Sequence, residues 1–64
     1  MDFIYFNNRY INKYAILCLY PMKFDCFYRV YIVLANGDNL VESFRTEEES
    51  NKRYHEILEC LNSD

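Results

Sequence analysis

Residues 27–61, FYRVYIVLANGDNLVESFRTEEESNKRYHEILECL, decide the fold. Their first part, residues 27–35, is rich in β-branched and aromatic side chains, which favours a strand. Asn36-Gly37 follows, and this dipeptide is typical of hairpin turns because both residues tolerate a positive φ. The sequence therefore predicts an antiparallel hairpin with strands over residues 27–35 and 38–45.

The length of the hairpin loop determines which side chains share a face. A two-residue loop would place Ile32 on one face with Val41, Ser43 and Arg45. We favour a three-residue loop ending at Gly37, which puts that glycine in the left-handed conformation of a bulge. This register gathers the apolar side chains on one face: Tyr28, Val30, Ile32, Leu34, Leu40 and Phe44.

A helix is predicted over residues 47–61. Thr46 and Glu49 have the spacing of a capping box, in which the threonine oxygen accepts from the Glu49 amide while the Glu49 carboxylate reaches back. Glu47 and Glu48 also favour the positive end of the helix dipole. The apolar stripe lies in the C-terminal half, which predicts that the first turns project beyond the sheet; it comprises Tyr54, Ile57, Leu58 and Leu61, with Ser50 continuing it.

The N-terminal half predicts two further strands, over residues 3–6 and 14–20. Asn8 is placed to cap a single helical turn over residues 9–12. Pro21 lacks the amide that a sheet requires and should end the second strand, leaving residues 22–26 as a loop. We thus expect a single α+β domain over residues 1–64, a small antiparallel sheet of three to four strands with one C-terminal helix packed on one face.

Size and cysteine content indicate the class of protein. A chain of 64 residues needs a good core or a partner, and its twelve aromatic residues can supply much of that core. Cys18, Cys26 and Cys60 match no zinc or redox spacing, and their odd number favours reduced, partly buried thiols, with Cys18 packed as a small hydrophobe. The longest apolar run is too short to span a membrane, so we expect a cytoplasmic protein without a membrane partner.

Charge is distributed unevenly along the chain. Residues 1–45 contain five basic against four acidic residues, and residues 46–64 contain two against six. Such an acidic chain should bind DNA nonspecifically only weakly. The helix charges predict either a solvated face with Glu48–Lys52 and Glu49–Arg53 pairs, or a docking surface around Glu47 and Glu48 for a basic partner that handles nucleic acid.

The pattern of reactive residues argues against an enzyme. His55, the only histidine, should be exposed on the polar side of the helix, and Cys60 is not spaced to pair with it. The single glycine excludes a glycine-rich phosphate loop. We therefore expect no catalytic residue, no cofactor and no metal site.

The second face of the hairpin has a different composition, which is typical of binding surfaces: Arg29, Tyr31, Val33, Asn39, Val41 and Ser43. Protein interfaces concentrate such residues, and sheet surfaces of this kind also stack single-stranded bases. Three interpretations stay open: residues 3–6 or the Met22 loop cover the face, it contacts a protein, or it binds nucleic acid. A second copy of the chain is one expected protein partner, with Tyr31 and Val33 packed across a two-fold axis.

The run V-x-I-x-L-x-N-G from Val30 to Gly37, followed by T-x-E-E, resembles the pattern of many short bacterial and phage proteins, including small flagellar proteins of the FlbD type. This resemblance covers about half of the chain. The short, acidic, tyrosine-rich character is also similar to phage-encoded inhibitors of host defence, which implies an acidic surface that blocks a nucleic-acid channel. We interpret the chain as a non-enzymatic inhibitor or adaptor, with single-stranded nucleic-acid binding or a structural subunit as alternatives.

Overall fold

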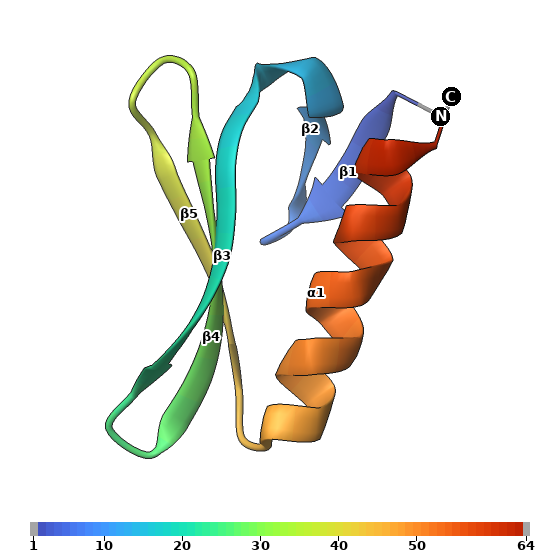
Figure 1. Cartoon of the computed structure of the whole chain (residues 1–64). Coiled ribbons are helices and arrows are strands. Elements are labelled where there is room, and N and C mark those ends of the chain that lie inside the picture. Colours follow the sequence, from blue (N-terminus) through green and yellow to red (C-terminus); the bar gives the residue numbers. More distant parts are fainter. Residues whose placement is uncertain (1, 64) are drawn as a thin grey trace.

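The computed structural model describes residues 2–63 and shows a small α+β fold with five strands and one long helix (Figure 1). The elements in chain order are β1 (Phe3–Phe6), β2 (Arg9–Asn12), the 3-10 turn η1 (Lys13–Ala15), β3 (Ile16–Phe24), β4 (Phe27–Leu34), β5 (Asn39–Phe44) and α1 (Glu47–Asn62). Strands β3, β4 and β5 form an antiparallel sheet in that order, and β1 and β2 form a separate hairpin. The predicted fold class is confirmed.

The predicted register of the β4–β5 hairpin is confirmed. Ile32 lies opposite Leu40. The Leu34 amide donates to the carbonyl of Asp38 at 2.8 Å, so the loop has three residues. Gly37 has a φ of 96°, which L side chains rarely adopt. This loop turns the apolar side chains of both strands toward the same face.

The predicted strand over residues 14–20 is wrong at both ends. Its first residues form η1, and β3 continues through Pro21 to Phe24. A proline is tolerated there because β3 is an edge strand with only one neighbour. In the predicted loop over residues 22–26, the first three residues belong to β3. Asp25 and Cys26 form a tight turn between the paired residues Phe24 and Phe27, with Asp25 at a positive φ of 57°.

The N-terminal hairpin was also missed. Residues 9–12 form β2 and pair with β1, so Asn8 caps no helical turn. Asn7 and Asn8 both have positive φ, 52° and 64°, which is the backbone of a type I′ hairpin turn. Asparagine tolerates this conformation better than most residues, and the pair of asparagines therefore closes the hairpin.

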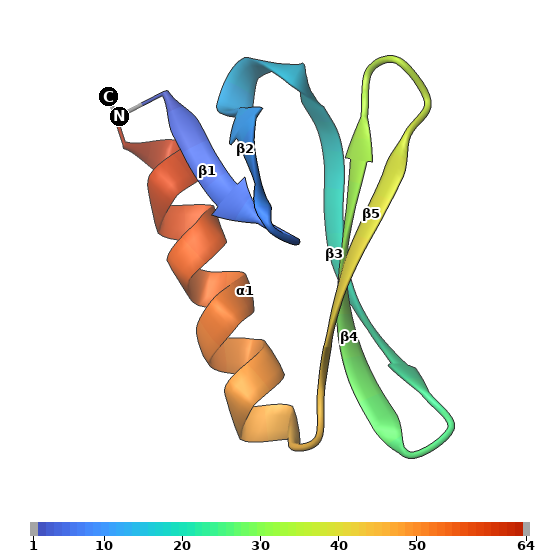
Figure 2. The ribbon, with the colours of Figure 1, turned by 180° about the vertical axis from the view of Figure 1, so that it is seen from behind.

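Helix α1 and the β1–β2 hairpin both lie on one side of the three-stranded sheet, and the two opposite views agree on this arrangement (Figures 1 and 2). The core fills the space between them. Its buried apolar residues come from all three parts of the fold: Ile4, Phe6, Ile11, Val30, Ile32, Leu34, Leu40 and Ile57. The helix alone does not cover the sheet, since the hairpin supplies three of these side chains.

Helix α1 begins at the predicted cap. The Thr46 hydroxyl oxygen accepts from the Glu49 amide at 3.2 Å, and the hydroxyl donates to the Glu49 carboxylate at 3.0 Å. In the predicted capping box the Glu49 carboxylate accepts from the backbone amide of Thr46. In the structure it accepts from the Thr46 hydroxyl instead. Ser50 is buried and packs toward the sheet, so the first turns do not project beyond it.

Two basic side chains connect the helix to distant segments. Lys13 is buried, and its Nζ donates to the carbonyl of Ser63 at 2.7 Å and to that of Cys60 at 3.5 Å. Arg53 pairs with Glu42 at 2.8 Å and donates to the Tyr5 carbonyl. The Lys13 contacts fix η1 against the end of α1. The contact of Arg53 with the Tyr5 carbonyl fixes the N-terminal hairpin against the middle of α1.

The predicted helix ion pairs are absent from residues 2–63. Arg53 pairs with Glu42 and, at 3.6 Å, with Glu56, so it does not pair with Glu49. Lys52 forms no ion pair with Glu48 in this range. Glu47, Glu48 and Glu49 in the first helical turn are exposed, and the Glu49 carboxylate accepts from the Thr46 hydroxyl.

The three cysteines are free thiols. Cys60 is half-buried beside the core, but Cys18 and Cys26 are exposed. The expectation that Cys18 packs as a small hydrophobe is wrong, because its side chain lies on the sheet face turned away from the core. Within residues 2–63, no helix has the length and apolar character needed to cross a membrane.

Candidate binding surface on the open sheet face

The side of the sheet turned away from α1 is uncovered. In Figures 1 and 2 no element of residues 2–63 lies on it. We call it the open sheet face; pairing places on it the side chains of Cys18, Tyr20, Met22, Phe24, Phe27, Arg29, Tyr31, Val33, Asn39, Val41 and Ser43. The interpretation that other parts of the chain cover this face is wrong: β1 packs into the core on the opposite side, and Met22 belongs to the face itself.

Large apolar side chains are exposed at one end of the open sheet face, beside the β3–β4 turn. Phe24 is 54% exposed, Met22 45% and Phe27 40%. Phe24 lies directly opposite Phe27, and Met22 lies opposite Arg29. Scattered exposed apolar residues are ordinary, but several on adjoining positions of one face indicate a contact surface.

Arg29 lies at the centre of this cluster. Its guanidinium carbon is 4.6 Å from the centroid of the Phe24 ring, a cation–π contact, and its Nη1 donates to the Tyr31 hydroxyl at 3.2 Å. Its Nε is buried and has no hydrogen-bond partner within residues 2–63. Arg29 therefore has a fixed position, and most of its N–H groups have no protein partner in this range.

The middle of the face is a tyrosine stack. Tyr20 and Tyr31 lie on neighbouring strands with ring centroids 5.1 Å apart and an interplanar angle of 11°. Tyr31 is also opposite Val41, and Val33 is opposite Cys18 and Asn39. The predicted contact residues Arg29, Tyr31, Val33 and Val41 are thus brought together on one surface by the β3–β4–β5 register.

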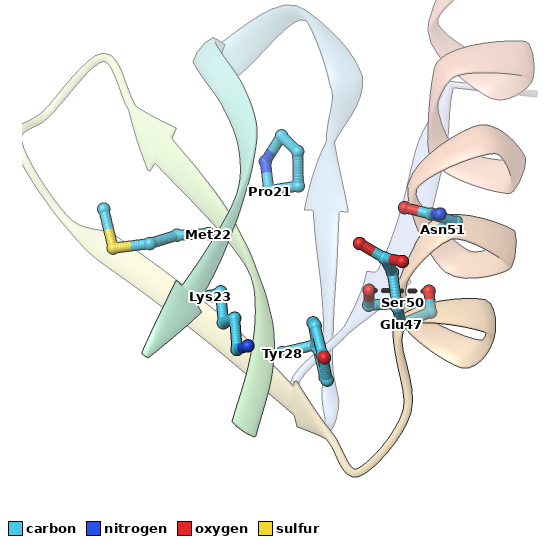
Figure 3. A pocket seen from close by; sticks show the side chains of 7 residues that line it. All are labelled: Pro21, Met22, Lys23, Tyr28, Glu47, Ser50 and Asn51. Atoms are coloured by element: carbon cyan, nitrogen blue, oxygen red, sulfur yellow. Dashed lines mark hydrogen bonds between the residues drawn. The ribbon is translucent and has the colours of Figure 1, made fainter. Parts of the chain in front are cut away.

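Glu47 and Glu48 lie elsewhere. They begin α1, on the other side of the sheet, and both are exposed. Glu47 borders an open groove of about 220 Å³ between α1 and the end of the sheet, together with Tyr28, Lys23 and Ser50 (Figure 3). Met22 also borders the groove, but in the same view its side chain points away from α1, toward the open sheet face. The two predicted contact areas are therefore distinct surfaces.

Sequence reasoning missed the contribution of β3 to this surface. Tyr20, Met22, Phe24 and Phe27 were assigned to a strand end, a loop and a strand start, so they were not placed with Tyr31. A weak signal was present, because Cys18, Tyr20, Met22 and Phe24 recur at the two-residue period of a strand, but Leu19 and Pro21 between them are also apolar. The proline obscured that period.

The open sheet face carries groups that can bind a partner by noncovalent contacts. Its groups are aromatic rings, a thioether, a guanidinium, hydroxyls and a thiol, which suit packing and hydrogen bonding. His55 is exposed on α1, as predicted, with its ring 5.7 Å from that of Tyr54. Residues 2–63 contain no cluster of three or more His, Cys, Asp or Glu side chains that could hold a metal ion.

Comparison of the chain with protein-family models, curated proteins and solved structures gives no match.

Proposed function

We propose that this chain is a small, non-enzymatic protein-binding module that acts as an inhibitor or adaptor through its open sheet face. The observation that carries the proposal is the exposed cluster of Met22, Phe24 and Phe27 around the half-buried Arg29 and Tyr31. Tyrosine and arginine are among the residues that contribute most binding energy at protein interfaces, and phenylalanine and methionine are enriched there. A rigid sheet also holds them in place before a partner arrives, which lowers the entropic cost of binding.

A protein partner is favoured over single-stranded nucleic acid. Stacked tyrosines would suit bases, but backbone phosphates require several basic groups, and Arg29 is the one charged residue among the eleven positions of the face. The first turn of α1 lies at the same end of the molecule as the β3–β4 turn (Figure 1). It carries the exposed residues Glu47, Glu48 and Glu49, whose negative charge would repel phosphates. The chain as a whole has a net charge of −3.

Replacing Tyr31 and Val33 together by alanine should strongly weaken partner binding through the open sheet face while leaving the protein folded. Both side chains point away from the core, so their loss creates no internal cavity. Loss of two central contact residues should weaken binding by about tenfold or more. The measurement is affinity capture of proteins from bacterial and phage-infected lysates with immobilised wild-type and variant chains, compared by quantitative mass spectrometry.

Tyr10→Ala is the matched control, because Tyr10 is 74% exposed but lies on the separate β1–β2 hairpin. The control should retain the wild-type set of captured proteins. Circular dichroism should show the same spectrum for all three chains. If the double variant captures the same proteins as the wild type at the same yield, the open sheet face is not the contact surface.

The acidic first turn of α1 is proposed as a second contact area, for a basic partner. Glu47, Glu48 and Glu49 are exposed, and none of them forms an ion pair within residues 2–63. A nucleic-acid-handling protein would present the complementary charge. The resemblance to short phage-encoded inhibitors supports this assignment, and cytoplasmic action in bacteria follows from the same proposal.

Charge reversal tests this second area. Glu47→Lys combined with Glu48→Lys should abolish capture of basic proteins and leave capture through the open sheet face unchanged. The substitutions also place cations at the positive end of the helix dipole, which costs roughly 0.3–1 kcal/mol each. Lys52→Glu is the control, since it changes charge on the same helix beyond its first turn. Equal capture of basic proteins by the reversed chain and the wild type would contradict the proposal.

A further inference from the structure

Arg29 is the one charged residue of the open sheet face, and no carboxylate lies on that face to pair with it. Within residues 2–63 it donates one hydrogen bond, to a neutral hydroxyl, and it forms no ion pair. Asp25, in the adjoining turn, does not pair with it. A partner that covers the open sheet face would remove water from this guanidinium, and the cost of that step is several kcal/mol unless the partner supplies an acceptor. The best acceptor is a carboxylate, which binds a guanidinium through two parallel bonds.

A second copy of this chain supplies that acceptor poorly. In a two-fold dimer the face meets itself, and none of its eleven positions is acidic. Three strands about 4.8 Å apart and eight residues at about 3.3 Å each give the face dimensions of roughly 14 by 26 Å. A two-fold dimer through it would bury two guanidinium groups with no carboxylate to pair with either of them.

The form of the occupant follows from backbone hydrogen bonding. The strands of the sheet pair with one another, so its face has no free amide or carbonyl to offer. An extended peptide laid on the face would leave its own backbone groups against aromatic rings without partners. At the β3 edge, Pro21 and the bulge between Ile16 and Cys18 hinder strand addition. A helix satisfies its backbone internally, and its width of about 10–12 Å fits the face.

We propose that the open sheet face binds an amphipathic helix of a partner protein that carries one carboxylate within its apolar stripe, and that Arg29 pairs with this carboxylate. This inference rests on the proposed function and specifies its partner. The apolar stripe packs on Phe24, Phe27 and Tyr31. The existing contacts of Arg29 with Phe24 and Tyr31 hold the guanidinium in place, so little side-chain entropy is lost on binding.

The test uses two synthetic amphipathic helices of about 17 residues, long enough to span about 26 Å. They are stapled in helical form, labelled with a fluorophore, and identical except for Glu or Gln at the centre of a Leu- and Met-rich stripe. Binding to the full chain is measured by fluorescence anisotropy. We expect the Glu peptide to bind about tenfold more tightly than the Gln peptide, as a charge-assisted hydrogen bond predicts.

Arg29→Gln should abolish this difference in affinity between the two peptides and still bind both weakly. Arg9→Gln is the matched control, because Arg9 is exposed on the separate hairpin and its loss should preserve the preference for Glu. A chain that binds both peptides equally, or a preference for Glu that survives Arg29→Gln, would overturn the inference.

Two further measurements distinguish the other occupants. Tight binding of a single-stranded oligothymidine at low ionic strength that is lost in the Tyr31 and Val33 double variant would assign the face to nucleic acid. A concentration-dependent dimer in sedimentation that the same variant dissociates would assign it to a second copy. Either result overturns the helix assignment. Lysate capture that depends on Tyr31 and Val33 but not on Arg29 would refute this inference and retain the open sheet face as a contact surface. Capture that is independent of all three residues would refute this inference and the role of the open sheet face in the proposed function.

Discussion

Phe6→Ala should lower the free energy of unfolding by about 3–5 kcal/mol. The Phe6 side chain is fully buried at the end of β1, where the N-terminal hairpin meets the helix and the sheet. Truncating a buried phenylalanine costs about 3–5 kcal/mol, through lost burial and the cavity that remains. A chain of 64 residues is expected to be stable by only about 3–10 kcal/mol, so this single change removes much of the total.

The location of Phe6 makes the cavity difficult to repair. The ring also lies under the Arg53 guanidinium, whose carbon is 5.6 Å from its centroid, and Arg53 in turn binds Glu42 and the Tyr5 carbonyl. Loss of the ring should therefore loosen the hairpin as well as the core. The free energy of unfolding is measured by urea titration followed by far-ultraviolet circular dichroism.

Phe3→Ala provides the comparison, because Phe3 lies on the same strand but is 50% exposed. It should cost much less than Phe6→Ala, close to the change of about 0.5 kcal/mol that is usual at surface positions. Similar free energies of unfolding for the two variants would show that β1 does not contribute to the core.

The C-terminal half of the fold was predictable because each local signal agreed with the others. Asn36-Gly37 predicted the turn, the apolar alternation selected its register, and Thr46 with Glu49 located the start of the helix. These signals depend on residues near one another in the chain, which is why they can be read from sequence.

The N-terminal half was less predictable because its signals were ambiguous. Asn7 and Asn8 suit both hairpin turns and helix caps, and only the pairing of β1 with β2 selects the turn. Pro21 ends most strands, but it is tolerated in β3 because β3 lies at a sheet edge, which is a property of the tertiary fold.

Part of the candidate site was predictable because it depends on local sequence, and the rest depends on the tertiary fold. Arg29, Tyr31, Val33 and Val41 were placed on one face by the alternation of the hairpin alone. That this face is uncovered depends on where β1 and β2 pack, and that Phe24 lies against Arg29 depends on the length of β3. Met22 and Phe24 thus come from the part of β3 that the predicted strand left out.

Lys13 is the clearest case of a stabilising residue that sequence reasoning could not identify. Helix α1 has no basic residue in its last turn, and its final carbonyls need donors. Lys13 supplies one from outside the helix, with Nζ 2.7 Å from the Ser63 carbonyl and 3.5 Å from that of Cys60. Its positive charge also lies at the negative end of the helix dipole. A lysine fifty residues away in sequence gives no local sign of this contact.

Lys13→Met should destabilise the protein by about 2 kcal/mol. Methionine preserves most of the buried aliphatic volume of lysine. The loss of stability therefore reports the hydrogen bonds of Lys13 to the Ser63 and Cys60 carbonyls and its charge at the helix end. Leaving a buried carbonyl without a donor costs about 1–3 kcal/mol. Lys23→Met is the control, because Lys23 is exposed, its ammonium lies over the Tyr28 ring at 5.5 Å, and it forms no ion pair within residues 2–63. It should change stability by less than about 0.5 kcal/mol. Amide hydrogen exchange should show faster opening of the last turn of α1 in Lys13→Met alone; unchanged exchange there would mean that Lys13 does not hold the helix end.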